Sequence, residues 1–178
     1  MYRRARLGIM LIALALLAVQ TACDDDLGDN VRNTDFFAEE TFSFEVAVVQ
    51  QEAFEVAGIN GQINVVGVPG RTSIEIEGTR RVESESVADA EANLERLQVV
   101  LTEQTDFVRV HTDQPDQPRG RVFIVDYVVT VPDGLEVDID NINGRIVLEA
   151  IEGLADVQNV NGVVQLIELR GNTTVGVV

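Results

Sequence analysis

Few side chains in this sequence combine the type and spacing that catalysis or metal binding requires. The chain has one histidine, His111, and one cysteine, Cys23. A zinc site needs three or four such ligands, and a catalytic nucleophile needs a base beside it. His111 has neither kind of partner and falls in a predicted strand, so we interpret it as a surface residue. Phosphate-binding and dinucleotide-binding glycine patterns are also missing from the sequence, and we expect no enzyme activity, no metal and no cofactor.

Acidic and amide side chains near residue 140 raise the question of a calcium site. The residues are Asp138, Asp140, Asn141 and Asn143. If Asp138 is position 1 of an EF-hand loop, position 5 is Ile142, and position 6 is Asn143 where that loop requires glycine. The spacing therefore excludes an EF-hand. We expect stacked asparagine side chains that hydrogen-bond to one another along a repeat.

Paired carboxylates could also hydrolyse glycosidic bonds. Four acidic residues could share one face of a repetitive fold: Glu149, Glu152, Asp156 and Glu168. Because the chain has thirty acidic residues, some pairs are expected by chance. A carbohydrate-active β-helix therefore remains only an alternative.

The acidic balance argues against two classes of partner. The net charge is −17, and removing the three arginines of a predicted signal peptide leaves −20. Nucleic-acid binding depends on cationic side chains that neutralise phosphates. Anionic lipid would likewise repel the body of the protein. We interpret the excess as solvated acidic surface, with an acidic ligand-binding patch as the alternative.

The N-terminus is typical of an exported protein. Basic residues precede an apolar stretch at 9–19, which is too short for the ~20 residues of a membrane-spanning helix. Residues 1–22 are therefore predicted to be a signal peptide. Residues 20–23, QTAC, resemble the lipobox of bacterial lipoproteins, which implies lipidation of Cys23 and a membrane anchor in the bacterial cell envelope. An ordinary secretory signal with an incidental cysteine is the alternative.

Residues 23–41 are predicted to be an acidic tether. The segment is rich in Asp and Asn and shows little apolar periodicity. A random coil of this length reaches roughly 20 to 25 Å. The alternation of Phe42, Phe44, Val46 and Val48 then predicts the first strand of a domain that covers residues 42–178.

An internal repeat is the most informative structural signal. Residues 141–153, NINGRIVLEAIEG, superpose on residues 159–171, NVNGVVQLIELRG, at a shift of 18. A third copy, GINGQINVVGVPG at 58–70, matches the first at a shift of 83. Before these copies, Phe54 and Val56 correspond to Val137 and Ile139. The turn residues are Asn60, Gly61, Asn143, Gly144, Asn161 and Gly162.

Each copy reads as a strand, a turn and a strand. Asn-Gly supplies the positive φ angles of a tight turn, and apolar residues alternate on both sides of it. A unit this small cannot bury its apolar face alone, but copies stacked about 4.8 Å apart can share one core. We predict a mainly β fold, a β-solenoid of about 18-residue rungs. An antiparallel meander of Asn-Gly hairpins is the competing interpretation.

An insertion of residues 79–134 explains the larger of the two shifts. Within it, Ser86 begins a capping box. Apolar residues then recur at helical spacing, which predicts a helix over 87–98: Val87, Ala90, Leu94, Leu97 and Leu101, of which Leu101 fits either this helix or the strand that follows. Strands are predicted at 99–103, 107–111 and 122–131, with a proline-containing acidic loop at 113–119. We expect the helix to cover the solenoid.

The insertion helix, the segment VDYVVTVPDGLEVDI at 125–139 and the recurrent Asn-Gly pairs resemble the putative-adhesin family of bacterial β-solenoid envelope proteins. The resemblance covers about residues 42–178 and supplies no catalytic residues. It implies surface adhesion or scaffolding, with an unknown envelope protein or surface ligand as partner. A regulatory partner of an envelope-stress system is the main alternative.

The last residues fall inside a further copy of the repeat. Val175 takes the place of Val157, and Val178 takes the place of Val160. In register, an Asn-Gly turn would come next. We infer a C-terminally truncated chain with an unpaired edge, which favours self-association.

Overall fold

The computed structural model describes residues 34–177, so the predicted signal peptide, Cys23 and the tether up to residue 33 lie outside the described residues. The described part is mainly β, with ten strands and one helix. In chain order the elements are β1 (Phe36–Ala47), β2 (Ala53–Ala57), β3 (Ile63–Val68), β4 (Ser73–Ser84), α1 (Val87–Leu94), β5 (Gln98–Glu103), β6 (Phe107–Asp113), β7 (Val122–Pro132), β8 (Glu136–Glu149), β9 (Ala155–Ile167) and β10 (Thr173–Val177).

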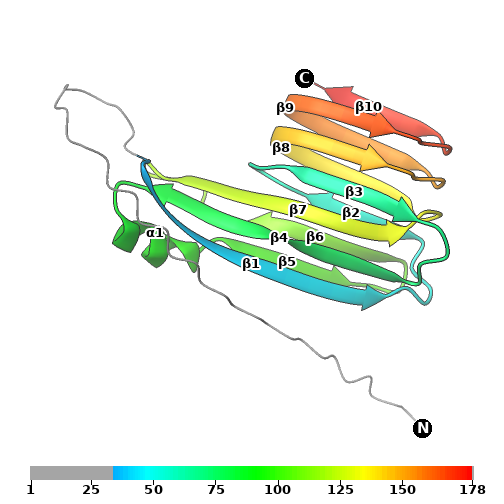
Figure 1. The fold of residues 1–178 in the computed structure, drawn as a ribbon, viewed down its shortest axis with the longest axis horizontal. Coiled ribbons are helices and arrows are strands. Elements are labelled where there is room, and N and C mark those ends of the chain that lie inside the picture. Colours follow the sequence, from blue (N-terminus) through cyan, green and yellow to red (C-terminus); the bar gives the residue numbers. More distant parts are fainter. Residues whose placement is uncertain (1–33, 178) are drawn as a thin grey trace, which may run out of the picture.

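All ten strands belong to one curled, open sheet (Figure 1). Its order is β1-β4-β7-β3-β8-β2-β6-β5, and β9 and β10 continue from β8. The sheet curls because β8 and β9 each turn back on themselves. Residues 136–140 of β8, its first arm, pair with β2, whereas residues 146–149, in its second arm, pair with β3. In β9 the corresponding first and second arms are residues 155–159 and 163–167.

The curl gives the sheet two layers that face each other across the core. The first layer holds β5, β6, β2, the first arms of β8 and β9, and β10. The second layer holds β1, β4, β7, β3 and the second arms. Alternate residues of each strand point inward, and the largest buried side chains are Tyr127, Phe54 and Phe123. Burial of Val, Ile and Leu from both layers stabilises the curl.

The strand register pairs the residues that the sequence repeat equates. β8 and β9 pair in parallel with Asn143 opposite Asn161, at the shift of 18. Phe54 pairs with Val137, and an isolated bridge joins Asn60 to Asn143, at the shift of 83. These parallel pairings exclude the antiparallel hairpin interpretation for the three copies. At this level the structure is a curled open sheet, and a β-solenoid stack of Asn-Gly rungs is not shown.

Three predicted boundaries differ from the structure. The first strand begins at Phe36, inside the predicted tether, and not at Phe42. Position 79, the predicted start of the insertion, lies inside β4, which runs without a break to Ser84. The helix ends at Leu94 and not at residue 98, because Gln98 already begins the antiparallel pairing of β5 with β6.

The insertion is part of the sheet. Its strands β6 and β7 pair in parallel with β2 and β3, so they extend the two layers by one strand each. β4 and β1 then add antiparallel strands next to β7. The helix α1 packs against β1 and β4 at one end of the sheet, as expected of a covering element (Figure 1).

Candidate functional site

The Asn-Gly pairs lie where the chain passes from the first layer to the second, between β2 and β3 and within β8 and β9. Gly144 has a φ of 136°, a backbone conformation that favours glycine. A Cβ atom on Gly144 would lie 1.9 Å from the carbonyl oxygen of Gly61 in the neighbouring copy. Successive copies therefore stack so closely at this bend that only glycine fits.

Asparagine side chains form a ladder along the outside of the bend. The Nδ2 atom of Asn143 donates to Oδ1 of Asn60 at 2.8 Å, and Nδ2 of Asn161 donates to Oδ1 of Asn143 at 2.9 Å. On the inside, buried Asn141 and Asn159 donate to the carbonyl oxygens of Gly61 and Gly144. The Nδ2 groups of the four donating residues bond to the protein itself and hold the bend together. Oδ1 of Asn141 and Oδ1 of Asn159 are buried and accept no hydrogen bond from the described residues.

An acidic face covers the outside of the first layer. We use this name for the outward carboxylates of β2, β8 and β9, namely Glu55, Glu136, Asp138, Asp140 and Asp156. The strand register places Glu55 beside Asp138, and Asp138 beside Asp156. Neighbouring strands lie about 4.8 Å apart, so these three carboxylates form a close column. One cation adjoins the column, because Arg109 of β6 lies 3.4 Å from Glu55.

The electrostatics of the column are unfavourable at its centre. Partial desolvation and the negative charges of Asp140, Asp156 and Glu55 raise the pKa of Asp138, against the opposing effect of Arg109. The sequence contained a signal for this column that we missed, because the shifts of 83 and 18 also relate Glu55 to Asp138 and Asp138 to Asp156. Among residues 34–177, no cluster of His, Cys, Asp or Glu has the arrangement of a metal site.

The four carboxylates considered for glycoside hydrolysis are not brought together. Asp156 lies on the first arm of β9, whereas Glu149 ends the second arm of β8 in the other layer. Glu152 is in the loop between these strands and forms an ion pair with Arg170 at 2.6 Å, and Glu168 follows β9. The arrangement offers no acid and base on opposite sides of one groove.

His111 lies half-buried in β6, between Ala57 and Val100 on the neighbouring strands. Its Nδ1 atom makes no hydrogen bond. Neither neighbour can act as an acid, a base or a ligand, so the position supports no catalytic role.

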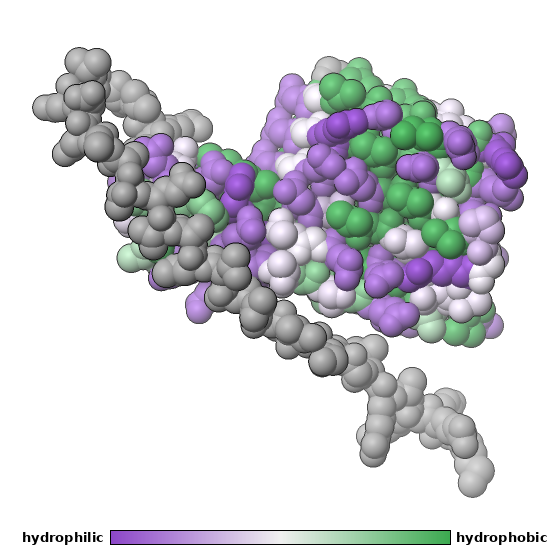
Figure 2. All heavy atoms as spheres, viewed as in Figure 1, coloured by the Kyte–Doolittle hydropathy of each residue, from purple (hydrophilic) through white to green (hydrophobic). Residues whose placement is uncertain are grey.

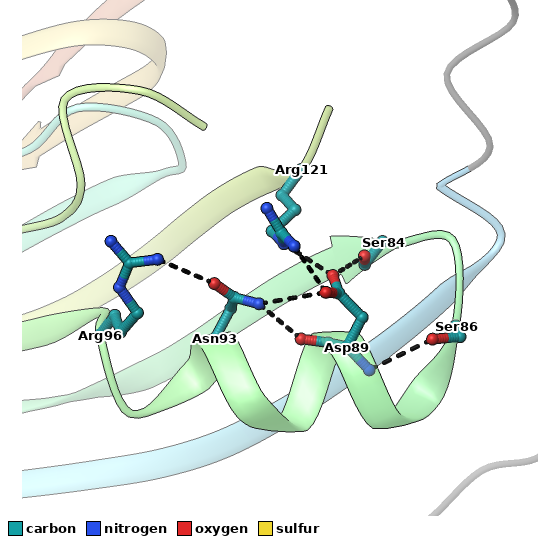
Figure 3. A network of polar contacts seen from close by, with 6 residues as sticks. All are labelled: Ser84, Ser86, Asp89, Asn93, Arg96 and Arg121. Atoms are coloured by element: carbon teal, nitrogen blue, oxygen red, sulfur yellow. Dashed lines mark hydrogen bonds and ion pairs between the residues drawn. The ribbon is translucent and has the colours of Figure 1, made fainter. Parts of the chain in front are cut away.

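A polar network joins the helix to the sheet (Figure 3). Asp89 receives two hydrogen bonds from the guanidinium of Arg121, at 2.6 and 2.5 Å, and one from the hydroxyl of Ser84. The Ser86 hydroxyl caps the helix by accepting from the Asp89 backbone N–H at 3.2 Å. The bonds from Arg121 and Ser84 lower the pKa of Asp89 to about 2. This network positions α1 against the sheet.

The helix α1 is too short to cross a bilayer, and the described part of the chain contains no other helix. The predicted lipidation site, Cys23, lies outside that part.

No protein-family model and no curated protein matches this chain. Among solved structures, the chain is similar to a putative cell adhesion protein from Clostridium sporogenes, with 8% identity, a TM-score of 0.38, and coverage of 77% of this chain and 98% of that one. It is also similar to a putative adhesin from Bacteroides fragilis, with 8% identity, a TM-score of 0.28, and coverage of 78% and 97%. A putative adhesin from Parabacteroides distasonis has 11% identity, a TM-score of 0.22, and coverage of 76% and 65%. With all three TM-scores below 0.5, these likenesses are too remote to assign a function.

Proposed function

We propose that this chain is a non-enzymatic cell-envelope lipoprotein that presents an acidic β-solenoid face for adhesion or scaffolding. A lipid on Cys23 anchors it, and residues 24–33 hold the β domain away from the membrane. The observation that carries the proposal is the register of Glu55, Asp138 and Asp156, which gives a rigid surface with negative charges at a regular spacing.

The solenoid part of the proposal rests on the parallel stacking of the repeat copies. Each copy crosses from the first layer to the second at an Asn-Gly pair, and the next copy pairs with it residue by residue. Such stacking makes one rigid outer face from short, similar units. A rigid face loses little conformational entropy on binding, which suits an adhesive or scaffolding surface.

The acidic face points to a partner with regularly spaced cations. Like charges held on neighbouring strands repel one another, and the raised pKa of Asp138 reflects that repulsion together with desolvation. A cationic partner relieves the repulsion when it binds. Complementary charge of this kind contributes most to the rate and specificity of association.

Binding of the purified β domain to a cationic surface tests this proposal. Residues 24–178 contain every core residue of the described chain, so this part retains the whole fold. The variant Asp138→Asn/Asp140→Asn/Asp156→Asn removes three charges from the acidic face. The control, Glu39→Gln/Glu45→Gln/Glu77→Gln, removes three exposed charges from β1 and β4 in the other layer.

On immobilised cationic polysaccharide at physiological salt, we expect the acidic-face variant to lose at least tenfold in affinity. The control variant has the same net charge and is expected to bind nearly as well as wild type. Equal losses in the two variants would mean that only net charge matters, which would contradict a specific face.

A further inference from the structure

The first layer is one strand shorter than the second where the sheet ends in β1 and β5. β6 and β7 extend the two layers by one strand each, and β5 and β4 follow them. β1 then continues the second layer alone, so no strand of residues 34–177 faces it from the first layer. The helix α1 packs near the beginning of β1 (Figure 1), but Phe42 and Phe44 further along stay only partly buried. A strand added to β5 would face β1 and cover these two rings.

The free edge of β5 carries backbone groups that can accept such a strand. The N–H of Gln104 donates to the carbonyl oxygen of Phe107 at 2.9 Å, toward β6. Because backbone groups alternate between the two sides of an antiparallel strand, the register directs residues 98, 100 and 102 toward β6 as well. The N–H and C=O groups of Val99, Leu101 and Glu103 therefore point away from the sheet.

The sequence of β5 does not oppose pairing. Edge strands that must stay unpaired usually carry charges. β1 follows this rule with Glu39, Glu40 and Glu45, whereas β5 reads QVVLTE and carries its one charge at the last residue. Val99 and Leu101 face the core from β5 and are only partly buried. This edge is therefore suited to an additional strand that also contributes apolar side chains to the core.

An open cleft of about 420 Å³ lies at the end of β5. Its lining comes from the loop before β2 and the turn after β5: Val49, Gln50, Gln51, Glu103, Gln104 and Thr105. Nε2 of Gln51 donates to the carbonyl oxygen of Gln104 at 3.1 Å, so the two segments are held together and the cleft is preformed. Of the six lining residues only Glu103 is charged, and it is exposed. Figure 2 shows hydrophobic surface at the lower right of the molecule, where β1 runs into this loop.

We propose that β5 binds an extended peptide segment of a partner protein as an additional antiparallel strand, with a Lys or Arg of that segment in the cleft beside Glu103. Antiparallel pairing is the more stable kind and continues the pairing of β5 with β6. In strand addition of this type, backbone hydrogen bonds supply affinity and alternate side chains supply specificity. The surface is separate from the acidic face, which lies on β2, β8 and β9.

The register of the pairing gives the sequence pattern of the partner. Directly opposed residues of antiparallel strands point to the same side of the sheet. The partner residues opposite Leu101 and Val99 therefore face the core and are apolar. The residue opposite Glu103 comes two positions earlier in the partner and is basic. In N-to-C order the segment reads basic, any, apolar, any, apolar.

The charge in the cleft favours a partner protein over segments of this chain. Residues 24–33 read DDDLGDNVRN and contain no basic residue followed by alternating apolar residues. β5 of a second copy carries glutamate as its one charge and offers no cation to the cleft.

Hydrogen exchange with a synthetic peptide tests the proposal. The probe is KTVTVT, acetylated and amidated at its ends, added to residues 24–178. We expect the amides of Val99 and Leu101 to exchange quickly in the free protein and about tenfold or more slowly at saturating peptide. The amides of Val100 and Thr102 already bond to β6 and should change little.

Matched peptides and variants test the register and the cleft. Methylation of the backbone nitrogen of either valine of the probe removes a bond to β5 and should weaken binding about tenfold or more, whereas methylation of the threonine between them should not. Glu103→Gln should abolish the preference for KTVTVT over ETVTVT. The control Glu77→Gln, an exposed change on β4, should keep this preference.

The opposite results would overturn the proposal. They are unchanged exchange at Val99 and Leu101, equal effects of methylation at valine and threonine, and equal binding of KTVTVT and the reversed peptide TVTVTK. Slow exchange of the same two amides in the free protein would also overturn it, because a second copy or residues 24–33 would then fill the edge. None of these results bears on binding through the acidic face, which is measured separately.

Discussion

The amide of Asn143 donates a hydrogen bond to the amide oxygen of Asn60, which lies 83 residues earlier in the chain, at 2.8 Å. The two residues hold the same position in two copies of the repeat. The strands β3 to β7 and the helix α1 lie between them in sequence. The bends at Asn60 and Asn143 nevertheless stack as closely as the bends at Asn143 and Asn161, where the corresponding hydrogen bond is 2.9 Å long. The contact therefore connects the first copy of the repeat to the later ones.

Replacing Asn143 by alanine removes two hydrogen bonds of the asparagine ladder. Asn143 donates to Asn60 and accepts from Asn161, and each such bond contributes about 0.5–1.5 kcal/mol. We expect Asn143→Ala to lower the free energy of unfolding by about 1–2 kcal/mol in urea titrations. Asn161→Ala removes only one of these bonds and should cost about half as much. Equal effects of the two variants would contradict the ladder.

Adding one methyl group at Gly144 tests the close stacking of the bends. The Cβ atom would lie 1.9 Å from a backbone oxygen, and the residue would keep a positive φ. Together these effects should cost about 3 kcal/mol or more in chemical denaturation. Gly134→Ala is the control, because its Cβ meets no atom within 4 Å. A small effect at Gly144 would mean that the bends are further apart.

The network around Asp89 predicts a stability that depends on pH. The pKa of Asp89 is lowered to about 2 from its ordinary value of 3.8, so its charged form stabilises the folded state. This contribution is complete well above the ordinary pKa and is lost as the pH falls through the folded-state pKa of about 2. Asp89→Asn should lower the melting temperature at pH 7, and the difference from wild type should shrink steadily as the pH falls from the ordinary pKa toward and below that value. Glu91→Gln, an exposed change on the same helix, should have little effect at either pH.

At the acidic face, we expect stability to depend on pH with the opposite sign. The pKa of Asp138 is raised, so its charged form opposes folding once the pH exceeds the ordinary pKa of an aspartate. Asp138→Asn should therefore raise the melting temperature at pH 7, and more so at low salt, where repulsion is less screened. The gain should vanish in acid below the ordinary pKa. A loss of stability at pH 7 would contradict the repulsion in the column.

The bends and their partners could be predicted from the sequence because Asn-Gly pairs mark each copy and the shifts of 18 and 83 fix the register. The acidic face follows from the same shifts, but a column of carboxylates is visible only when outward positions are compared between copies.

The early start of β1 could not be predicted, because a glutamate, Glu40, interrupts the apolar alternation on the inward side. Its charge is satisfied in the fold by Arg80, at 2.5 Å, and Arg80 also donates to the carbonyl oxygen of Leu97. The end of the helix could not be predicted either, because an apolar residue beyond it continues the helical spacing. Leu97 continues the apolar stripe and is buried, although it lies beyond the last helical turn.

Adhesion of bacteria that express residues 1–178 tests the proposed role of the acidic face. Cells are allowed to settle on a cationic polysaccharide surface and the attached fraction is measured after washing. We expect attachment by wild type and by Glu39→Gln/Glu45→Gln/Glu77→Gln. We expect loss of attachment for Cys23→Ser, which removes the proposed lipidation site, and for Asp138→Asn/Asp140→Asn/Asp156→Asn, which removes three charges of the acidic face. Undiminished attachment by the acidic-face variant, at equal surface expression, would contradict adhesion through the acidic face.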